Sequence, residues 1–294
     1  MYSIILVHIG DQFFDYINDC IEQIIKFNNC DIYLIISNKH KNKITDNANI
    51  IEIESLPITE KHKLFNQNTT LDRNFRGGFW KFATERFFFI EDLMIYKNIQ
   101  NVFHFENDVL IYRNISDFFE IFSEKYEMAA TFDNDNRCIP GFMYLKNSDL
   151  ISKLTKFILT VNGMNDMELI PMFNNYYKSF GNLPIIPSNY DKPLKSTSGL
   201  VTYKKEKYYE NFHLFNSIFD AAALGQYLGG IDPRNAPSKP GFINESCLFN
   251  TSLLTFSWVR DTNNRKIPYA TFNGKKYKIN TLHIHSKKLE LFLS

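Results

Sequence analysis

The sequence predicts an α/β protein in which a mostly parallel central sheet is flanked by helices and a β-hairpin lies near the C-terminus. Apolar runs at residues 3–9 and 31–37 are typical of buried strands, and a helical pattern over 13–27 separates them. A strand, a helix and a second strand at this spacing form a βαβ unit, which requires a parallel sheet. Near the C-terminus, Asn273-Gly274 joins two strand-like segments and favours a two-residue hairpin turn.

The other elements follow in order from the same two periodicities. Residues 49–56 alternate as a third strand, residues 57–75 are polar and unpatterned and predict a loop, and residues 79–96 have the apolar spacing of a helix packed on a sheet. Further strands are predicted at residues 102–105, 128–132, 142–145, 267–272 and 276–285, and further helices at 116–123, 148–161 and 167–180. One more helix is predicted to begin near Asn216 and to end at Gly229-Gly230.

Composition and charge argue against several classes of protein. The 294 residues include 33 basic and 32 acidic side chains, so the net charge of +1 argues against a protein that binds nucleic acid through a basic face. The four cysteines are scattered singly and predict reduced thiols rather than disulfides or a structural zinc site. No apolar run approaches the length of a membrane span and no signal peptide is recognisable, so we expect a cytoplasmic protein. Because there is no repeat or linker, we expect residues 1–294 to form a single domain.

Two acidic residues interrupt the apolar segment 102–112. Glu106 and Asp108 follow the strand at 102–105, and buried carboxylates are costly unless a cation or a metal ion meets them. Open α/β sheets bind ligands at the carboxyl ends of their parallel strands. At that place an acid-x-acid pair can hold Mg²⁺ or Mn²⁺ together with the phosphates of a substrate. The alternative is that Glu106-Asn107-Asp108 is an ordinary polar turn after the strand.

A pair of glycines precedes the helix at 79–96. Gly77 and Gly78 leave backbone N–H groups accessible at the start of this helix, and Arg76 and Lys81 add positive charge there. This combination favours the binding of a diphosphate. The alternative is a flexible connection whose cations are solvated.

Two histidines and a lysine alternate along the last predicted strand. His283, His285 and Lys287 are expected on one face of it, and Leu282 and Ile284 on the other. An imidazole is a suitable further ligand for a metal ion held by carboxylates, and a lysine beside it can hold a leaving phosphate. The competing interpretation is a pair of surface histidines.

Together, these features resemble the GT-A class of nucleotide-sugar-dependent glycosyltransferases, of the type that builds microbial or viral surface glycans. The resemblance rests on the N-terminal βαβ unit, the basic helix leading to Glu106-Asn107-Asp108, and the late histidines. The segments 219–235 and 241–245 are also similar to segments of such transferases. The acidic motif is an E-x-D variant of the DxD motif of that class, and its longer first side chain can act through a water molecule.

The resemblance implies a metal-dependent transfer of a sugar from a nucleoside diphosphate-sugar, with a UDP-sugar as the expected donor, to a hydroxyl of a glycan or glycoconjugate acceptor. Residues 1–113 would form the nucleotide-sugar-binding half, and residues 114–294 the acceptor-side half with the C-terminal hairpin. Mn²⁺ or Mg²⁺ would be held by Glu106, Asp108 and His283 or His285. The donor would be contacted by Arg76, Gly77, Gly78, Lys81 and Lys287.

Acidic residues in the second half are candidates for the base that an inverting transfer requires, whereas a retaining transfer does not require one. In falling order the candidates are Asp220, Glu245 and Asp166. Asp220 and Asp166 also have a structural interpretation, because each is expected near the start of a helix, where an acidic side chain interacts favourably with the helix dipole.

Two further pairs of charged residues have open roles. Asp232 and Arg234 lie in a proline-bounded loop, where they would contact the donor or pair with each other. Asp133 and Asp135 form a second acid-x-acid pair after the strand at 128–132. They are the main rival for the metal ion, although their position fits the acceptor or donor-sugar side better.

Two other functions are compatible with the sequence. A metal-dependent sugar-phosphate nucleotidyltransferase would use a similar sheet and acidic pair and would release pyrophosphate, but Gly10-Asp11 is too short for the Gly-rich phosphate loop of such enzymes. A non-catalytic glycan-binding module would exploit the 28 Phe, 16 Tyr and 2 Trp residues, since aromatic rings stack on sugars. Such a module would bind its glycan without a divalent cation.

Overall fold

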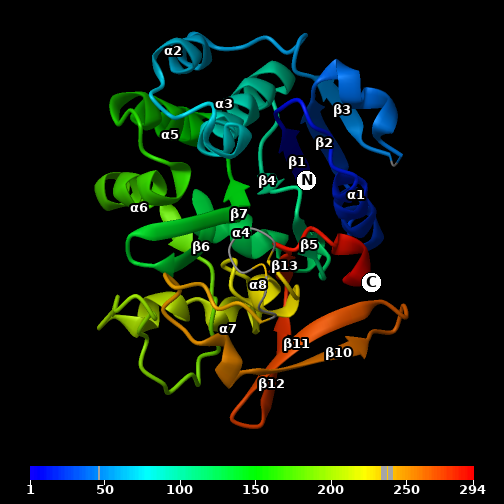
Figure 1. Cartoon of the computed structure of the whole chain (residues 1–294). Coiled ribbons are helices and arrows are strands. Elements are labelled where there is room, and N and C mark those ends of the chain that lie inside the picture. Colours follow the sequence, from blue (N-terminus) through cyan, green and yellow to red (C-terminus); the bar gives the residue numbers. More distant parts are fainter. Residues whose placement is uncertain (46, 233–236, 238–240) are drawn as a thin grey trace.

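The largest sheet of the protein has seven strands in the order β3-β2-β1-β4-β7-β6-β8 (Figure 1). The computed structural model describes residues 1–294 except 46, 233–236 and 238–240. The strands are β1 (Ser3–His8), β2 (Asp31–Ile36), β3 (Asn49–Glu52), β4 (Val102–Phe105), β6 (Met128–Asn134), β7 (Arg137–Leu145) and β8 (Phe180–Asn182). Of these seven, β7 runs opposite to the others. The predicted mostly parallel sheet is therefore confirmed.

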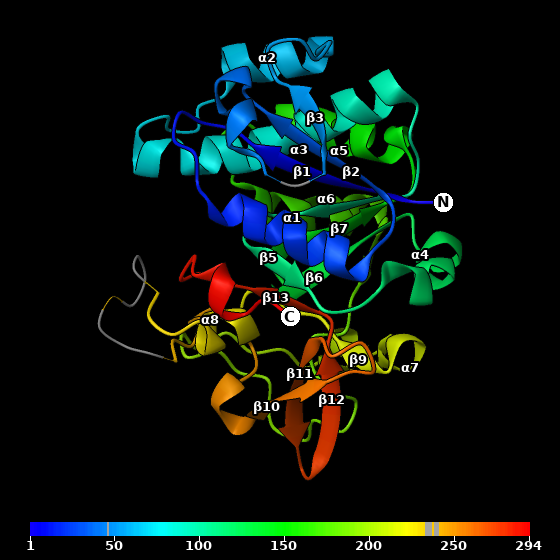
Figure 2. The ribbon, with the colours of Figure 1, turned by 90° about the vertical axis from the view of Figure 1, so that its right-hand side faces the viewer.

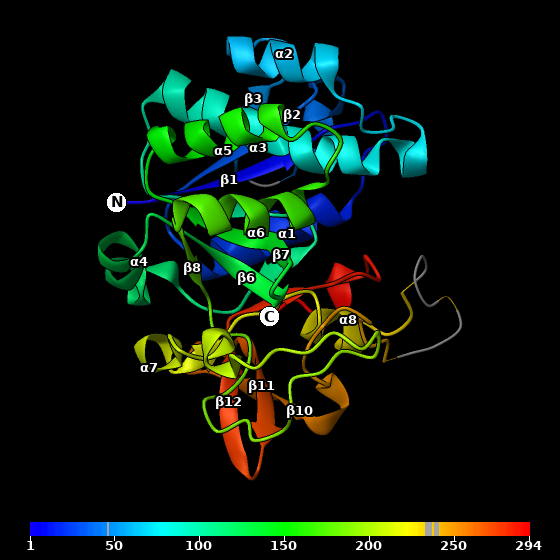
Figure 3. The same ribbon diagram turned by 90° about the vertical axis from the view of Figure 1, so that its left-hand side faces the viewer.

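Helices cover both faces of this sheet. α1 (Tyr16–Phe27) lies on one face, and α3 (Phe79–Lys97), α5 (Ser148–Thr160) and α6 (Asp166–Tyr177) lie on the other (Figure 2, Figure 3). α2 (Glu60–Asn68) packs against α3 and α5. Because α3 lies between the sheet and α2 and α5, most of its surface is buried, including several charged side chains. None of the helices within the described ranges is long and apolar enough to cross a membrane.

Two predictions of secondary structure are wrong. The loop predicted over 57–75 contains α2, whose N-cap Thr59 accepts a hydrogen bond from the backbone of His62 and whose buried side chains are His62 and Phe65. Two buried positions in a polar helix are too few for a visible helical period. The helix predicted from Asn216 is instead the short strand β9 (Ser217–Ile218), a turn, and the short helix α8 (Leu224–Leu228).

A second sheet is formed by the C-terminal part of the chain in the order β10-β11-β12-β9. Its longer strands are β10 (Thr255–Arg260), β11 (Lys266–Phe272) and β12 (Lys275–Ile279). The hairpin predicted around Asn273-Gly274 is confirmed, since β11 and β12 pair in antiparallel register and both turn residues have positive φ, 48° and 75°. The sequence did not indicate β10 or β8. The remaining helices are α4 (Phe119–Lys125) and α7 (Phe212–Phe215).

The strand predicted over 276–285 is divided at Asn280, and its second part changes partners. β13 (Thr281–His283) leaves the hairpin sheet and pairs in antiparallel register with β5 (Val109–Ile111). In this register His283 lies opposite Val109. The pairing brings the end of the chain to the turn that follows β4, and it thereby builds the candidate site.

Candidate functional site

The site lies at the carboxyl end of β4, where Glu106-Asn107-Asp108 connects this strand to β5. The tripeptide is a turn, since the N–H of Val109 donates to the carbonyl of Glu106 at 3.0 Å and the side chain of Asn107 donates to the carbonyl of Val7 at 2.9 Å. Asp108 is buried, and the Glu106 side chain is 23% exposed. An ordinary polar turn would expose its carboxylates to solvent. Here the two carboxylates face inward, toward the end of β13.

Glu106, Asp108 and His283 form a compact triad. The Nε2 atom of His283 lies 3.2 Å from Oε2 of Glu106 and 3.2 Å from Oδ1 of Asp108. Among the described residues, these three offer potential metal-ligand atoms that all lie within 4.8 Å of one another. The longer glutamate side chain approaches the imidazole as closely as the aspartate does, so it does not need a water molecule to reach the centre of the triad.

Cations hold the other oxygen of each carboxylate. Arg86, on α3, lies with Nη1 2.6 Å from Oε1 of Glu106, and Lys287 pairs with Oδ2 of Asp108. Burial opposes ionisation of Glu106, but the neighbouring positive charges, Arg86 first among them, together outweigh it and hold the pKa of this carboxyl below its ordinary value. Burial lowers the pKa of Lys287 to about 8, against the attraction of Glu106. Each carboxylate thus has one oxygen paired with a cation outside the triad and one oxygen directed toward His283.

The arrangement fits a hard divalent cation. Magnesium binds oxygen at about 2.0–2.1 Å in octahedral geometry, which places neighbouring ligand atoms roughly 3 Å apart. The two separations of 3.2 Å at His283 are close to this spacing. A cation bound there would be held by Nε2 and by one oxygen of each carboxylate. The outer oxygens would keep Arg86 and Lys287, which fix the direction of both carboxylates.

The sequence analysis missed Arg86 as a residue of the site. Its guanidinium bridges Glu106 and Asp166, with Nη2 2.8 Å from Oδ2 of Asp166. A signal was available, because Phe82 and Ile90 lie four residues before and after Arg86 and place it on the apolar stripe of the helix. A cation in such a stripe requires a buried anionic partner. Burial raises the pKa of Asp166, the Arg86 charge lowers it, and Glu106 raises it further.

His283 and His285 face the same side, as the alternation predicted, but they have different partners. Their ring centroids are 4.6 Å apart, and Leu282 and Ile284 are fully buried on the other side. Nδ1 of His285 lies 3.2 Å from Oδ2 of Asp232 and 2.7 Å from Nε2 of Gln226. His283 is therefore the imidazole that belongs to the triad. Arg234, the predicted partner of Asp232, lies outside the described residues.

Asp220 is saturated with backbone hydrogen bonds. Oδ1 accepts from the N–H groups of Ala223 and Leu224, and Oδ2 accepts from those of Gly225 and His283, all at 2.7–2.8 Å. The side chain is buried. This carboxylate caps α8 and ties it to β13 at the residue that completes the triad. Asp220 therefore contacts the N-terminus of a helix, as the helix-dipole interpretation predicted.

Gly225 makes this attachment possible. A Cβ atom at this position would lie 2.6 Å from the backbone nitrogen of His283 and 2.7 Å from its carbonyl carbon. Only a glycine allows the first turn of α8 to approach β13 so closely.

The predicted diphosphate-binding residues lie at the start of α3, and their surroundings differ. Arg76, Gly77 and Gly78 have φ values of 48°, 68° and 86°, and Gly78 is the N-cap of the helix. Arg76 is exposed. Lys81 is buried, and its ammonium donates to Oε2 of Glu85 at 2.6 Å and to Oδ1 of Asn66 at 2.8 Å. Lys81 is thus already neutralised inside the helical layer.

The remaining acidic candidates lie around the tip between β6 and β7. Asp133 and Asp135 do not act as a pair, because Asp133 is buried against Arg137 whereas Asp135 contacts Lys207 and Tyr208. Burial raises the pKa of Asp133 to about 6, although the Arg137 charge lowers it. Neither residue belongs to the triad. Glu245 is exposed in the loop that packs beside this tip.

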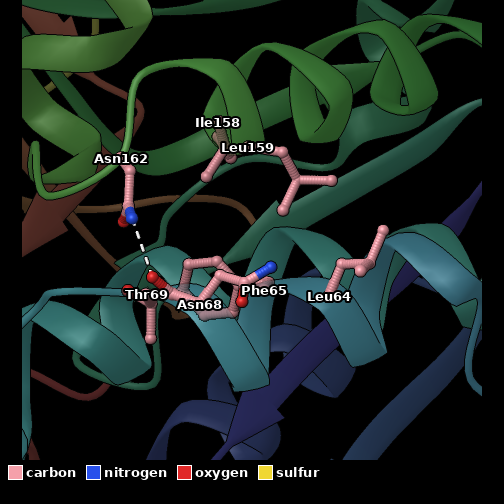
Figure 4. Close-up of a pocket in the computed structure, with 7 residues that line it drawn as sticks. All are labelled: Leu64, Phe65, Asn68, Thr69, Ile158, Leu159 and Asn162. Atoms are coloured by element: carbon pink, nitrogen blue, oxygen red, sulfur yellow. Dashed lines mark hydrogen bonds between the residues drawn. The ribbon is translucent and has the colours of Figure 1, made fainter.

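One hollow of the described surface lies away from the triad, between α2 and α5 (Figure 4). It encloses about 110 Å³ and is lined by Leu64, Phe65, Asn68, Thr69, Ile158, Leu159 and Asn162. Its rim is closed by a hydrogen bond of 2.7 Å from the Asn162 amide to the Asn68 carbonyl. None of these lining side chains is charged, so the hollow has no groups for acid–base or metal chemistry.

Comparison with known proteins adds similarities of fold. Neither a protein-family model nor a curated protein sequence matches the chain. An active-site mutant of LgtC aligns with a TM-score of 0.45 and 10% identity over 70% of this chain and 81% of that one. Mouse xyloside xylosyltransferase 1 in its apo form aligns with a TM-score of 0.44 and 10% identity over 62% and 85%.

A third similar structure is the glycosyltransferase GlyE of Streptococcus pneumoniae TIGR4. It aligns with a TM-score of 0.41 and 12% identity over 62% of this chain and 44% of that one. A further structure of LgtC is described as a galactosyltransferase in complex with donor and acceptor sugar analogs. These proteins are glycosyltransferases, the class that the sequence motifs resemble.

Proposed function

We propose that this protein transfers a sugar from a nucleoside diphosphate-sugar, with a UDP-sugar as the expected donor, to a hydroxyl of a glycan or glycoconjugate. The observation that carries the proposal is the Glu106–Asp108–His283 triad at the carboxyl end of β4. Open parallel α/β sheets bind ligands at the carboxyl ends of their strands. The ligand lies at the topological switch point, where successive strands begin to be added on the other side of the first strand. In this sheet the switch point lies between β1 and β4, next to the triad.

The proposed metal ion is Mn²⁺ or Mg²⁺ held by Glu106, Asp108 and His283. When bound, it would supply Lewis-acid stabilisation of the negative charge that develops on the leaving diphosphate. Arg86 and Lys287 orient the two carboxylates through their outer oxygens. The Lys287 side chain is 37% exposed at the edge of the site, and we also assign it to the departing phosphate.

We assign Asp220 and Asp166 to positioning rather than to proton transfer. The four backbone N–H groups around Asp220 occupy both of its oxygens and leave it without a free lone pair for an acceptor hydroxyl. Asp166 is buried and acts on Glu106 through Arg86. Of the three predicted bases, Glu245 has an exposed side chain, and we propose it as the base if the transfer inverts the anomeric centre.

The test is a panel of UDP-, GDP-, CMP- and dTDP-sugars with and without Mn²⁺, with donor hydrolysis and the thermal shift of the protein as readouts. We expect one nucleotide class to be hydrolysed slowly and to stabilise the protein only when Mn²⁺ is present. Asp108→Asn should remove both effects. Asp135→Asn is the matched control, because it changes an acidic residue of the rival pair at the same sheet edge and should leave both effects intact.

Other outcomes would favour a different function. Release of pyrophosphate from a nucleoside triphosphate and a sugar phosphate would identify a nucleotidyltransferase. Binding of a glycan that persists in EDTA and in Asp108→Asn, with no donor turnover, would identify a glycan-binding module. Full hydrolysis of the donor by Asp108→Asn would contradict the proposed metal site.

A further inference from the structure

A small hairpin-like loop projects from the second half of the chain over residues 194–203. Lys195 and Val201 form an antiparallel bridge, and the N–H of Ser196 donates to the carbonyl of Leu200 at 2.8 Å. Gly199 makes the turn with a φ of 90°. Leu194 and Ser196 are buried and anchor the loop to the protein. The loop is therefore an ordered projection.

The outer side of this loop is unusually apolar. Leu200 is 42% exposed, Val201 is 50% exposed and Tyr203 is 95% exposed. Single exposed apolar residues are normal on a protein surface, but three within four positions of an ordered projection are not explained by the packing of this chain. Their exposure keeps about half or more of three large side chains in water.

Lysines flank these apolar side chains. Residues 194–207 contain four lysines and one glutamate, Glu206, so this stretch carries a net charge of +3. Lys207 pairs with Asp135 at 3.2 Å. Among the described residues, no ion pair is found for Lys195, Lys204 or Lys205. Three positive charges therefore surround the apolar tip without a neutralising partner.

We propose that this loop inserts into the surface of an anionic lipid bilayer, with Leu200, Val201 and Tyr203 in the headgroup boundary and Lys195, Lys204 and Lys205 on the lipid phosphates. A bilayer offers an apolar region directly beneath an anionic surface, and the loop presents these two chemistries in the same order. An acidic protein or a polyanionic glycan would match the lysines but would not require exposed Leu and Val. Tyrosine is a preferred side chain at the boundary of a bilayer.

The loop is joined by hydrogen bonds to the segment that contains Glu245. The carbonyl of Glu245 accepts hydrogen bonds from the N–H of Ser198 at 3.3 Å and from its hydroxyl at 2.9 Å. Lys207 and Tyr208 contact Asp135 at the tip between β6 and β7, at the sheet edge that carries the triad. Bilayer contact would therefore hold this edge of the molecule near the lipid surface. The proposal does not depend on the proposed catalytic function.

The test is co-sedimentation of the full chain with vesicles of phosphatidylcholine alone and with vesicles that also contain phosphatidylserine. We expect binding to the anionic vesicles that weakens as salt is raised. Leu200→Glu with Val201→Glu should abolish it. Lys204→Glu with Lys205→Glu should weaken it by about 25-fold or more, because each basic residue near an anionic surface contributes about fivefold. Tyr203→Trp should bind and show a blue-shifted emission from the added tryptophan.

The matched control is Ile95→Glu with Tyr96→Glu, which changes two apolar side chains of 50% and 55% exposure at the end of α3. This variant and Asp108→Asn should bind vesicles as the unchanged protein does. Absence of binding by the unchanged protein, or equal loss in the control, would overturn the proposal. Loss in the lysine variant with retention in the Leu200 and Val201 variant would also overturn it, and would indicate a polyanion instead of a bilayer. A melting curve for each variant checks that it folds.

Discussion

Substitution of Gly141 by alanine is expected to weaken the metal site without touching a ligand. Gly141 lies on β7 next to the triad, and its carbonyl accepts from the N–H of Glu106 at 2.9 Å. A Cβ atom at this position would lie 3.0 Å from Nδ1 of His283, 3.2 Å from Cγ2 of Val109 and 3.3 Å from Oε2 of Glu106. The backbone of Gly141 is outside the left-handed region, so alanine can adopt it.

The size of the effect follows from these contacts. Ordinary contacts of such atoms are longer by a few tenths of an ångström, so the imidazole and the carboxylate must both move outward. Overpacking of this kind costs about 1–3 kcal/mol. In the metal-free protein the imidazole can relax, but the metal-bound form needs both ligands in place. We therefore expect affinity for Mn²⁺ to fall by roughly 5- to 150-fold.

The assay is a titration with Mn²⁺ followed by electron paramagnetic resonance of the free ion, which requires no substrate. The control is Gly181→Ala on β8, where the added methyl group would overlap the ring of Tyr126, far along the sheet order from β4. This control should lower the melting temperature and leave the affinity for Mn²⁺ unchanged. Our reasoning would be refuted if Gly141→Ala bound Mn²⁺ as tightly as the unchanged protein, or if the control lost affinity as well.

Three other predictions concern the site and the helical layer beside it. Asp108→Asn should reduce affinity for Mn²⁺ by more than about 100-fold, because changing a residue that only supports a ligand already costs about 10–100-fold. An unchanged Mn²⁺ titration would exclude Asp108 as a ligand. Asp220→Asn should lower both the affinity for Mn²⁺ and turnover, since the amide group cannot accept all four N–H bonds. Loss of turnover at unchanged affinity for Mn²⁺ would instead indicate that Asp220 is the base. His62 lies between Asp92 and Glu85. Burial opposes the charge of this histidine, but the hydrogen bonds and the negative charges of the two carboxylates together outweigh burial and raise its pKa above 6.5. Its stabilising effect is therefore present below pH 6.5 and is lost as the pH rises through the folded value. Burial also opposes the charge of Glu85, yet His62 and Lys81 lower its pKa below 4.5, so its contribution is lost as the pH falls through that lower value. Urea unfolding of the unchanged protein and of His62→Gln across this range should therefore differ most between about pH 4.5 and 6.5, and a difference independent of pH would contradict the assignment.

The local patterns of the chain were sufficient for much of the fold. The apolar runs of β1, β2 and β4 and the helix periods of α1, α3 and α5 each depend on residues close in sequence. The Asn273-Gly274 hairpin is equally local, because the two residues alone favour the turn. The same reasoning located Glu106 and Asp108, since two carboxylates after a buried strand require a cationic partner whatever the surrounding fold.

Only the tertiary structure could select the partners of those carboxylates. His283 and His285 are equivalent in a strand pattern, and the break at Asn280 and the pairing of β13 with β5 decide that His283 meets Asp108. Arg86 and Asp166 come together from two helices that are far apart in sequence. Asp220 became a cap because a short turn replaced the predicted helix. These outcomes depend on contacts between distant segments. The free energy of such contacts is set by packing and desolvation in the folded chain, so a local sequence pattern can show that a charge needs a partner but not which residue supplies it.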